Sequence, residues 1–409
     1  MKRNISRRQF MQVAGVGALS AAAAGMLSGC GSSAAGGSAS GDTIKVGVLG
    51  PKTAGSAGDV SVYGLAVING ADLYLNQYTD KGDKDINGKK IEIIEMVEQG
   101  DDTQAVNCFT QMCDKGITGL VGDVTTTPTL AVVAVTQDES DPGYNMPMVT
   151  ASATAEAVTY DKDTDKVNTN VFRSTFTDPY QGLKMADYAF EKLGFKNAAI
   201  IMNKDGDYQT GLAASFTAEF ESKGGKVVDT ESYSKGDSDF KAQLTTIMSK
   251  SPEVVFCPNY YQDVGQILAQ ARDMGLTVPF LGGDGWDGVA EYATAAQLDG
   301  CYFCANYAAG ANADFESAYK TAYGQDYPNG FAPLGYDAAM TLVIGLEAAE
   351  KAGLEAGSAD YKQAVIDAIK AATVKGVTGS FTFDDHNDPV KTAAIQSFKD
   401  GKPVYVENY

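Results

Sequence analysis

The sequence predicts an α/β fold in which helices cover both faces of parallel β-sheets. Short apolar runs recur from Ile44 onward, and longer segments with helical spacing separate them. Such alternation is typical of parallel sheets, because successive parallel strands need a crossover connection that is usually a helix. The alternation occurs in two runs, one before and one after about Arg173, so we expect two sheets.

The first residues resemble the export signal of a bacterial lipoprotein. Four basic residues precede an apolar stretch over 13–27 that is short and rich in Gly and Ala for a membrane span. Leu27-Ser28-Gly29-Cys30 then resembles a lipobox, in which the cysteine is acylated, and the segment SRRQFM over 6–11 resembles a twin-arginine signal. We therefore expect residues 1–29 to be a twin-arginine-like lipoprotein signal peptide, with the general secretory route left open.

The next segment is expected to be a tether. Residues 31–41 read GSSAAGGSASG, and chains of this composition behave as flexible coil. We expect residues 30–42 to comprise the lipidated Cys30 and this tether. The protein would then be extracytoplasmic, anchored to the cell membrane at the cell surface or in the periplasm.

The folded body is expected to begin near Asp42. Its helices show apolar residues at helical spacing, as in 240–248 and 264–271. The expected strands are short and apolar; they are 44–50, 90–98, 116–122, 147–151, 197–203, 226–233, 253–259 and 278–284.

Charge and cysteine content exclude several classes of protein. The formal net charge is −20, and it becomes more negative once the basic signal is removed, so the surface repels nucleic acid and anionic lipid. Cys301 and Cys304 fit CxxC, but they lie in an expected strand, and neither a second pair nor a nearby histidine completes a zinc site. We expect no metal and mostly buried free thiols.

Catalytic chemistry is also not expected. The only histidine is His386, in the turn FDDHNDP, and no GxSxG is present, so a Ser-His-Asp or Cys-His arrangement is missing. The segment 283–288 satisfies GxGxxG, but its two aspartates would repel a pyrophosphate. We therefore expect no enzyme and no cofactor.

The residues after the strands indicate a binding site, because ligands of such sheets lie beyond the carboxyl ends of the strands. Thr126 precedes an apolar helical stretch and Thr154 stands at a similar corner, so hydroxyl and N–H groups there suit an anion such as a carboxylate. Asp284 follows the strand 278–284 and suits an ammonium group. Ordinary N-capping explains either threonine equally well. Aromatic residues suit the walls of a pocket or the core; they are Tyr63, Tyr208, Tyr260, Tyr261, Trp286 and Tyr336.

An ordered set of motifs resembles a known family. The stretches VGVLGPKTAG, GLVGDVTTTPTLAVV, MVTASATAE, VFRSTFTDPYQG and KDGDYQTGL resemble the periplasmic leucine/isoleucine/valine-binding proteins, which have the type I periplasmic-binding fold. The resemblance runs from about Ile44 to the end of the chain. It implies two doubly wound lobes joined by three crossovers, with lobe 1 at 43–172 plus 308–380 and lobe 2 at 173–307 plus 381–409.

The resemblance also implies roles for individual residues. Thr126 and Thr154 would bind the carboxylate of an amino acid, while Thr154, the Ala153 carbonyl and Asp284 would hold its ammonium group. Asp284 stands where leucine-binding members have a glutamate, which is one methylene longer. The side-chain pocket would be lined by aromatic residues, among which Trp286 is much bulkier than the residues often found nearby; they are Tyr63, Tyr208, Tyr260, Tyr261 and Trp286.

The function expected from these observations is the capture of an amino acid, branched-chain or otherwise apolar or aromatic, by closure of the two lobes. The protein would be the monomeric substrate-binding lipoprotein of an ABC importer, and its partner would be the permease in the membrane. Two alternatives stay open within the same fold. One is a receptor for small amides, urea or another carboxylate, and the other is a ligand-sensing lipoprotein that is not coupled to transport.

Overall fold

The computed structural model describes residues 43–53 and 60–409. The expected signal peptide, Cys30 and the tether lie outside these residues. Within them, no helix combines the length and the apolar character needed to cross a membrane.

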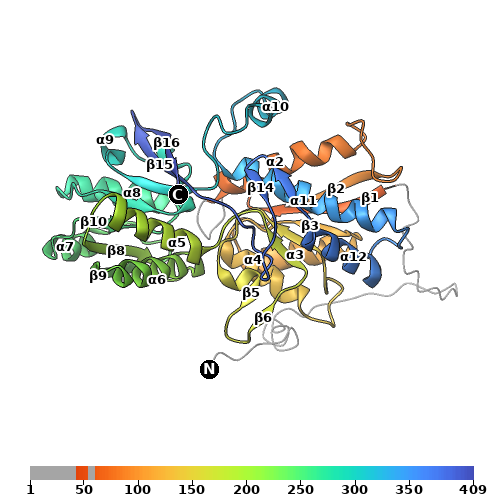
Figure 1. Ribbon diagram of the computed structural model, residues 1–409, viewed down its shortest axis with the longest axis horizontal. Coiled ribbons are helices and arrows are strands. Elements are labelled where there is room, and N and C mark those ends of the chain that lie inside the picture. The colour runs from red at the N-terminus through yellow and green to blue at the C-terminus, as the bar shows by residue number, and fades with distance from the viewer. Residues whose placement is uncertain (1–42, 54–59) are drawn as a thin grey trace, which may run out of the picture. The chain divides into compact units, whose positions relative to one another are not determined.

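The first sheet is formed by the N-terminal part of the chain and is entirely parallel (Figure 1). Its two longer strands lie next to each other at one edge. The other three strands are short and completely buried. In spatial order the strands are β2 (Lys90–Val97), β1 (Thr43–Gly50), β3 (Gly119–Val121), β4 (Met148–Thr150) and β7 (Val171–Arg173).

The second sheet mixes parallel and antiparallel strands. Five parallel strands form one part and a C-terminal antiparallel pair extends it. In spatial order they are β9 (Lys226–Tyr233), β8 (Asn197–Asn203), β10 (Val254–Phe256), β11 (Phe280–Gly282), β12 (Tyr302–Ala305), β15 (Ala394–Lys399) and β16 (Lys402–Asn408). Two short antiparallel pairs lie outside both sheets, β5 (Tyr160–Asp161) with β6 (Lys166–Val167) and β13 (Val374–Gly376) with β14 (Gly379–Phe381).

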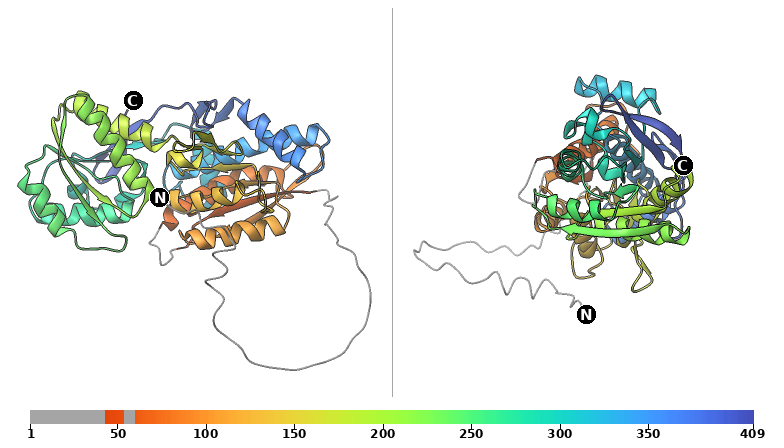
Figure 2. Two further views of the ribbon diagram at one scale, coloured as in Figure 1. Left: turned by 90° about the horizontal axis from the view of Figure 1, so that it is seen from below. Right: turned by 90° about the vertical axis from the view of Figure 1, so that its left-hand side faces the viewer.

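Helices follow most strands, as the alternation in the sequence predicts. Those in the first run are α2 (Ser61–Leu75), α3 (Asp102–Asp114) and α4 (Thr126–Thr136). Those in the second run are α5 (Asp178–Asp187), α6 (Asp207–Ser222), α7 (Lys241–Ser249), α8 (Tyr261–Asp273) and α9 (Ala295–Leu298). The later helices are α10 (Ala313–Tyr323), α11 (Phe331–Lys351) and α12 (Ala359–Lys370). Figure 2 shows α5 and α6 side by side over the second sheet.

Helix α11 packs directly on α2, although the two are far apart in the sequence (Figure 1). Two glycines allow this close approach. A Cβ at Gly70 would lie 1.8 Å from the carbonyl oxygen of Ala332, and a Cβ at Gly335 would lie 2.1 Å from that of Val67. The first turns of α11 thus lie against the middle of α2, and Phe331 at the start of α11 stacks on Tyr63.

The chain passes between the two sets of elements three times. The passages follow β7, β12 and β14. They are tied to one another: Asn306 Nδ2 donates to Thr175 Oγ1 at 2.9 Å, and Lys391 Nζ donates to the carbonyl of Ser174 at 2.8 Å. This agrees with the three crossovers of the predicted fold, while the exact lobe boundaries stay a prediction.

Among the described residues five cysteines are free. Cys257, Cys301 and Cys304 are buried, and Cys108 and Cys113 on α3 are half-buried. Burial raises the pKa of each thiol, so none of them is poised as a reactive thiolate.

Candidate functional site

The N-terminus of α4 lies beyond the end of β3 and is suited to an anion. Thr125 is the N-cap residue, yet its side chain accepts no hydrogen bond from the first turn. The Thr125 side chain therefore does not cap α4. The N-terminus of α4 thus has no side-chain cap, and the buried Thr126 begins the helix there, with its backbone hydrogen-bonded to Tyr260.

The loop after β4 is fixed against the loop after β3. Thr150 Oγ1 donates to the carbonyl of Asp123 at 2.6 Å, and Ser152 Oγ donates to that of Val124 at 2.7 Å. Thr154, two residues further on, is buried, and its carbonyl accepts from Asp178 N at 2.8 Å. The two hydroxyl-rich loops therefore form one rigid surface.

Asp284 lies after β11, at the end of a strand of the second sheet. Its backbone N–H donates to Gln181 Oε1 at 3.0 Å. Its side chain is 4 % exposed, and Oδ2 has no hydrogen-bond partner within the described residues. Burial raises the pKa of Asp284 to about 6, although hydrogen bonds from Gln181 and Tyr208 act in the opposite direction. A buried carboxylate oxygen without a partner is a place where a ligand N–H group would gain most.

Tyrosines form the walls between these groups. Tyr63, on the first turn of α2, stacks on Phe331 with ring centroids 4.3 Å apart. Its hydroxyl donates to the carbonyl of Gly285 at 2.5 Å. Tyr208 stacks on Tyr260 at 5.0 Å, and its hydroxyl accepts from Gly285 N at 3.0 Å.

These groups meet around one small cavity of about 10 Å³, which is room for about one water molecule. Six of the predicted site residues line it: Tyr63, Thr126, Thr154, Tyr208, Tyr260 and Asp284. The other lining residues were not predicted as such; they are Val124, Thr125, Ser152, Gly285 and Phe331.

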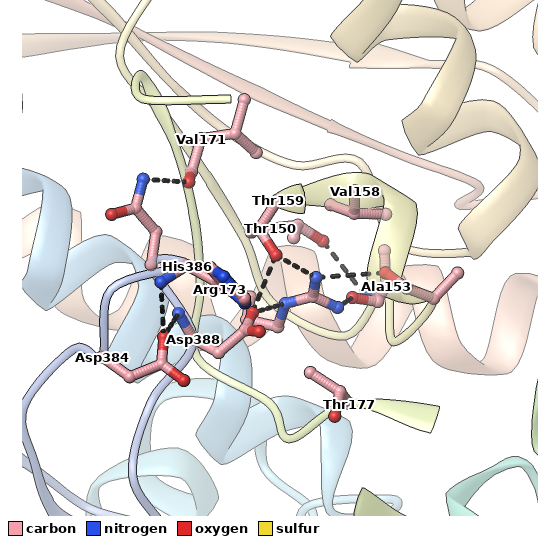
Figure 3. A network of polar contacts seen from close by, with 12 residues as sticks. Thr150, Ala153, Val158, Thr159, Val171, Arg173, Thr177, Asp384, His386 and Asp388 are labelled. Carbon is pink, nitrogen blue, oxygen red and sulfur yellow. Dashed lines mark hydrogen bonds and ion pairs between the residues drawn. The ribbon is translucent and has the colours of Figure 1, made fainter. Parts of the chain in front are cut away.

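Ala153 does not line the cavity, contrary to the expectation that its carbonyl meets the ligand. That carbonyl accepts from Arg173 Nη1 at 2.8 Å, as Figure 3 shows. Arg173 is fully buried, and its guanidinium also donates to the carbonyl of Ala155 at 3.0 Å and pairs with Asp388 at 2.6 Å. The Ala153 carbonyl therefore compensates a buried charge of the protein, and it fixes the loop that carries Thr154.

Tyr261 and Trp286 are core residues and do not line the cavity. The indole Nε1 of Trp286 donates to the carbonyl of Cys257 at 2.8 Å. Gly282 makes room for this ring, because a Cβ there would lie 1.9 Å from Nε1. Trp286 thus packs behind β11, so its bulk does not narrow the cavity. Tyr261 contacts the edge of Tyr63 from the buried side, with ring centroids 4.8 Å apart.

A second buried carboxylate, Asp178, stands behind the cavity and was not predicted from the sequence. It begins α5, and Gln181 Nε2 donates to its Oδ1 at 3.1 Å. Burial raises the pKa of Asp178 to about 8, and the charge of Asp284 adds to the increase. The proline that follows it, typical of a first helical turn, was the only signal in the sequence for its position.

The arrangement suits a small zwitterion. Hydroxyl and N–H groups face a carboxylate across the cavity, and aromatic rings lie between them. Among residues 43–53 and 60–409, no lysine, arginine or histidine lines the cavity, and His386 instead stacks on Tyr160 in a loop, with ring centroids 3.8 Å apart. Within the part of the chain that the structure describes, no cluster of His, Cys, Asp or Glu suits a metal.

The sequence profile of the periplasmic binding protein family matches residues 43–402. The chain belongs to this family. A "Leu/Ile/Val-binding protein homolog 3" from Brucella melitensis is 29% identical over 89% of the chain and 94% of its own length. The branched-chain amino acid transporter substrate binding protein LivJ from Streptococcus pneumoniae, solved in complex with isoleucine, is 29% identical with a TM-score of 0.77, over 90% of the chain and 99% of LivJ. The leucine binding protein LivK from Thermotoga maritima is 27% identical with a TM-score of 0.77, over 89% of the chain and 98% of LivK. These matches confirm the type I periplasmic-binding fold.

Proposed function

We propose that this periplasmic binding protein is the receptor of an ABC importer for apolar amino acids, with the branched-chain amino acids as its first candidates. The observation that carries the proposal is the pairing of an uncapped helix N-terminus at Thr126 with the unpartnered carboxylate oxygen of Asp284 on one cavity. An α-amino acid presents both a carboxylate and an ammonium group, which suits these two sides of the cavity. The names of the similar proteins support the same ligand class.

In this proposal the ligand carboxylate binds at Thr126 and Thr154, and the ammonium group binds Asp284. Tyr63 and Phe331, which stack on each other, form the apolar wall for the side chain.

Ligand entry requires that the two sides of the site move apart, since the cavity holds about one water molecule. We therefore infer a clam-shell motion between lobe 1 (43–172 plus 308–380) and lobe 2 (173–307 plus 381–409). A ligand that contacts both lobes shifts this balance toward the closed form, because its affinity for that form is higher.

The location and partners follow from the same proposal. Residues 1–29 direct export, and Cys30 carries the lipid that holds the protein at the outer side of the cell membrane. The closed, ligand-bound form is then presented to the permease, and the receptor works as a monomer.

The test is a thermal-shift screen of residues 42–409, purified free of bound ligand, against all amino acids, small amides, urea and sugars. A ligand at about a hundred times its dissociation constant should stabilise the protein by roughly 2.7 kcal/mol. We expect shifts with leucine, isoleucine and valine. Shifts only with amides, urea or carboxylic acids that lack an amino group would show that the alternative receptor is correct, and no shift with any ligand would favour the sensing lipoprotein.

A further inference from the structure

A second carboxyl group, Asp287, lies three residues after Asp284 but points away from the ligand cavity. It is 8 % exposed and does not line the cavity. Its Oδ2 accepts a hydrogen bond of 2.6 Å from the backbone N–H of Gly330, the N-cap residue of α11. The two residues belong to different halves of the protein, because Asp287 follows β11 of the second sheet, whereas α11 packs on α2 beside the first sheet.

Both the glycine at position 330 and the helix that begins beside it favour a contact with the Asp287 carboxyl group. Gly330 has no side chain, and a Cβ there would lie 2.7 Å from Oδ2 of Asp287, so only glycine leaves room for the carboxyl group. The helix that receives it has 21 residues, and a carboxylate is favoured at the N-terminus of such a helix. A hydrogen bond that involves an ionised group is stronger than one between neutral groups.

The same contact is next to the apolar wall of the site. Phe331 follows Gly330 and lines the cavity, and Tyr63, which stacks on Phe331, donates to Gly285 at 2.5 Å. The segment 284–287 is thus joined to the helices of the other half at two points, the Tyr63 hydroxyl and the Gly330 N–H. Of these two contacts, only the one between Tyr63 and Gly285 joins residues that both line the cavity.

We propose that Asp287 is a latch residue, whose carboxyl group holds segment 284–287 against the N-terminus of α11 in the closed form and slows the release of the ligand. The proposal rests on the proposed function, because it assumes closure on an amino acid. It adds a residue that acts on closure without contact to the ligand. Contacts made only in the closed form change the dissociation rate, whereas the association rate depends on the open form.

The experiment compares the wild type with Asp287→Ala and with Asp299→Ala, an exposed aspartate at the end of α9 that serves as the control for charge. The probe is L-isoleucine, and the signal is the fluorescence of Trp286, the only tryptophan of the chain, which lies between Asp284 and Asp287. At pH 8, where the Asp287 carboxyl group with its pKa of about 7 is mostly ionised, we expect Asp287→Ala to raise the dissociation rate at least about tenfold, in line with the loss of a hydrogen bond to a charged group. The association rate should change less than about twofold, and Asp299→Ala should match the wild type.

Two further variants separate the latch from a structural role. In Gly330→Ala the new Cβ would lie 2.7 Å from Oδ2 of Asp287 and displaces the carboxyl group. This variant should therefore raise the dissociation rate as Asp287→Ala does. Asp287→Asn keeps an oxygen for the Gly330 N–H and should release L-isoleucine more slowly than Asp287→Ala. The latch proposal places this contact in the closed form alone, so the melting temperature of the ligand-free protein should be the same for the wild type and the three variants within about 2 °C.

Unchanged dissociation rates in both Asp287→Ala and Gly330→Ala, with normal binding by the wild type, would disprove the latch and leave the proposed function intact. An equal loss of ligand-free thermal stability and of affinity in all three variants would assign Asp287 a structural role instead. If the wild type binds none of the amino acids, the proposed function is wrong and the latch is wrong with it.

Discussion

Asp284 and Asp287 have similar environments but different partners. Both are buried and follow the same strand, and burial raises the pKa of Asp287 to about 7 and that of Asp284 to about 6. Asp287 faces a backbone N–H of another helix, whereas one oxygen of Asp284 has no partner in the described part of the chain. Three residues along one loop thus separate a carboxyl group that binds another helix from one that lines the cavity.

The first prediction concerns Asp284. Asp284→Ala removes the only carboxylate that lines the cavity, so an ammonium group would be buried without its counter-charge. We expect the affinity for L-isoleucine to fall by about 2–5 kcal/mol, which is roughly 30- to 4,000-fold. Isothermal titration calorimetry measures this, with the exposed Asp273→Ala as the control. An affinity within about twofold of the wild type would show that Asp284 does not hold the ammonium group.

At the scale of elements, the ends of β2 and β3 carry a buried acid pair behind the ligand loops. Glu98 and Asp123 are both fully buried, and Val124 N donates to Asp123 Oδ1 at 2.5 Å. Burial raises the pKa of Glu98 to about 7, and it raises that of Asp123 well above its ordinary range, with the charge of Glu98 adding to the effect. Hydrogen bonds from the backbone of Asp101 and Gly100 oppose the increase for Glu98.

The second prediction follows from the sign of these shifts. A carboxyl group with a raised folded pKa favours the folded state in its protonated form, so its contribution is present below pH 4 and is lost as the pH rises to about 7. Urea unfolding between pH 4.5 and 8 should show this decline in the wild type and a smaller one in Glu98→Gln. Equal slopes in both proteins would contradict the prediction.

The third prediction concerns the contact between α2 and α11. Gly335→Ala places a Cβ 2.1 Å from the carbonyl oxygen of Val67, so the helices must separate. We expect a loss of about 1–3 kcal/mol in the free energy of unfolding, measured by urea denaturation. Gly211→Ala in α6 is the matched control, because its Cβ finds nothing closer than 3.5 Å, and it should stabilise the protein by about 0.5–1 kcal/mol. If Gly335→Ala has a free energy of unfolding no lower than that of Gly211→Ala, the contact between α2 and α11 is not tight.

The sequence predicted most strands of both sheets, and for two of them it also predicted both ends. The expected strands 197–203 and 226–233 agree with β8 and β9 at both ends, and the expected site residues on loops after buried strands line one cavity. The pair β15–β16 was not predicted, because β16 is an exposed edge strand and lacks an apolar run. Phe331 was not predicted as a site residue, since it reaches the cavity only through the packing of α11 on α2.

Ala153 and Trp286 lie next to residues that line the cavity, but the carbonyl of Ala153 and the indole of Trp286 bond elsewhere in the protein, and their part in ligand binding stays a prediction. A strand end shows which residues come near a ligand, but it does not show which way a carbonyl or a ring points. The direction of Ala153 depends on Arg173, and that of Trp286 depends on the space above Gly282. Both causes are tertiary contacts that no local pattern encodes.

At the scale of the whole molecule, Arg173 connects the ligand loop with the passage that follows β14. Its guanidinium binds the carbonyls of Ala153 and Ala155 on one side and Asp388 on the other (Figure 3). Thr159 Oγ1 also donates to Asp388 at 2.8 Å. A buried charge without its partner is costly, so the two segments depend on each other.

The fourth prediction tests this connection. Asp388→Ala leaves the Arg173 charge buried and uncompensated, and we expect the free energy of unfolding to fall by about 3–5 kcal/mol. Chemical denaturation measures it, with Asp385→Ala, an exposed neighbour in the same loop, as the control. A change below about 0.5 kcal/mol, as is usual for surface positions, would show that solvent or another group compensates Arg173.

The size of the cavity sets the timing of the receptor. Space for about one water molecule is too small for an amino acid, so under the proposed function a ligand enters and leaves only when the two sides of the site move apart. The residence time of a captured ligand then equals the waiting time for the protein to open. At saturation this waiting time is independent of how much ligand surrounds the cell, so each loaded receptor has the same interval in which to meet a transporter.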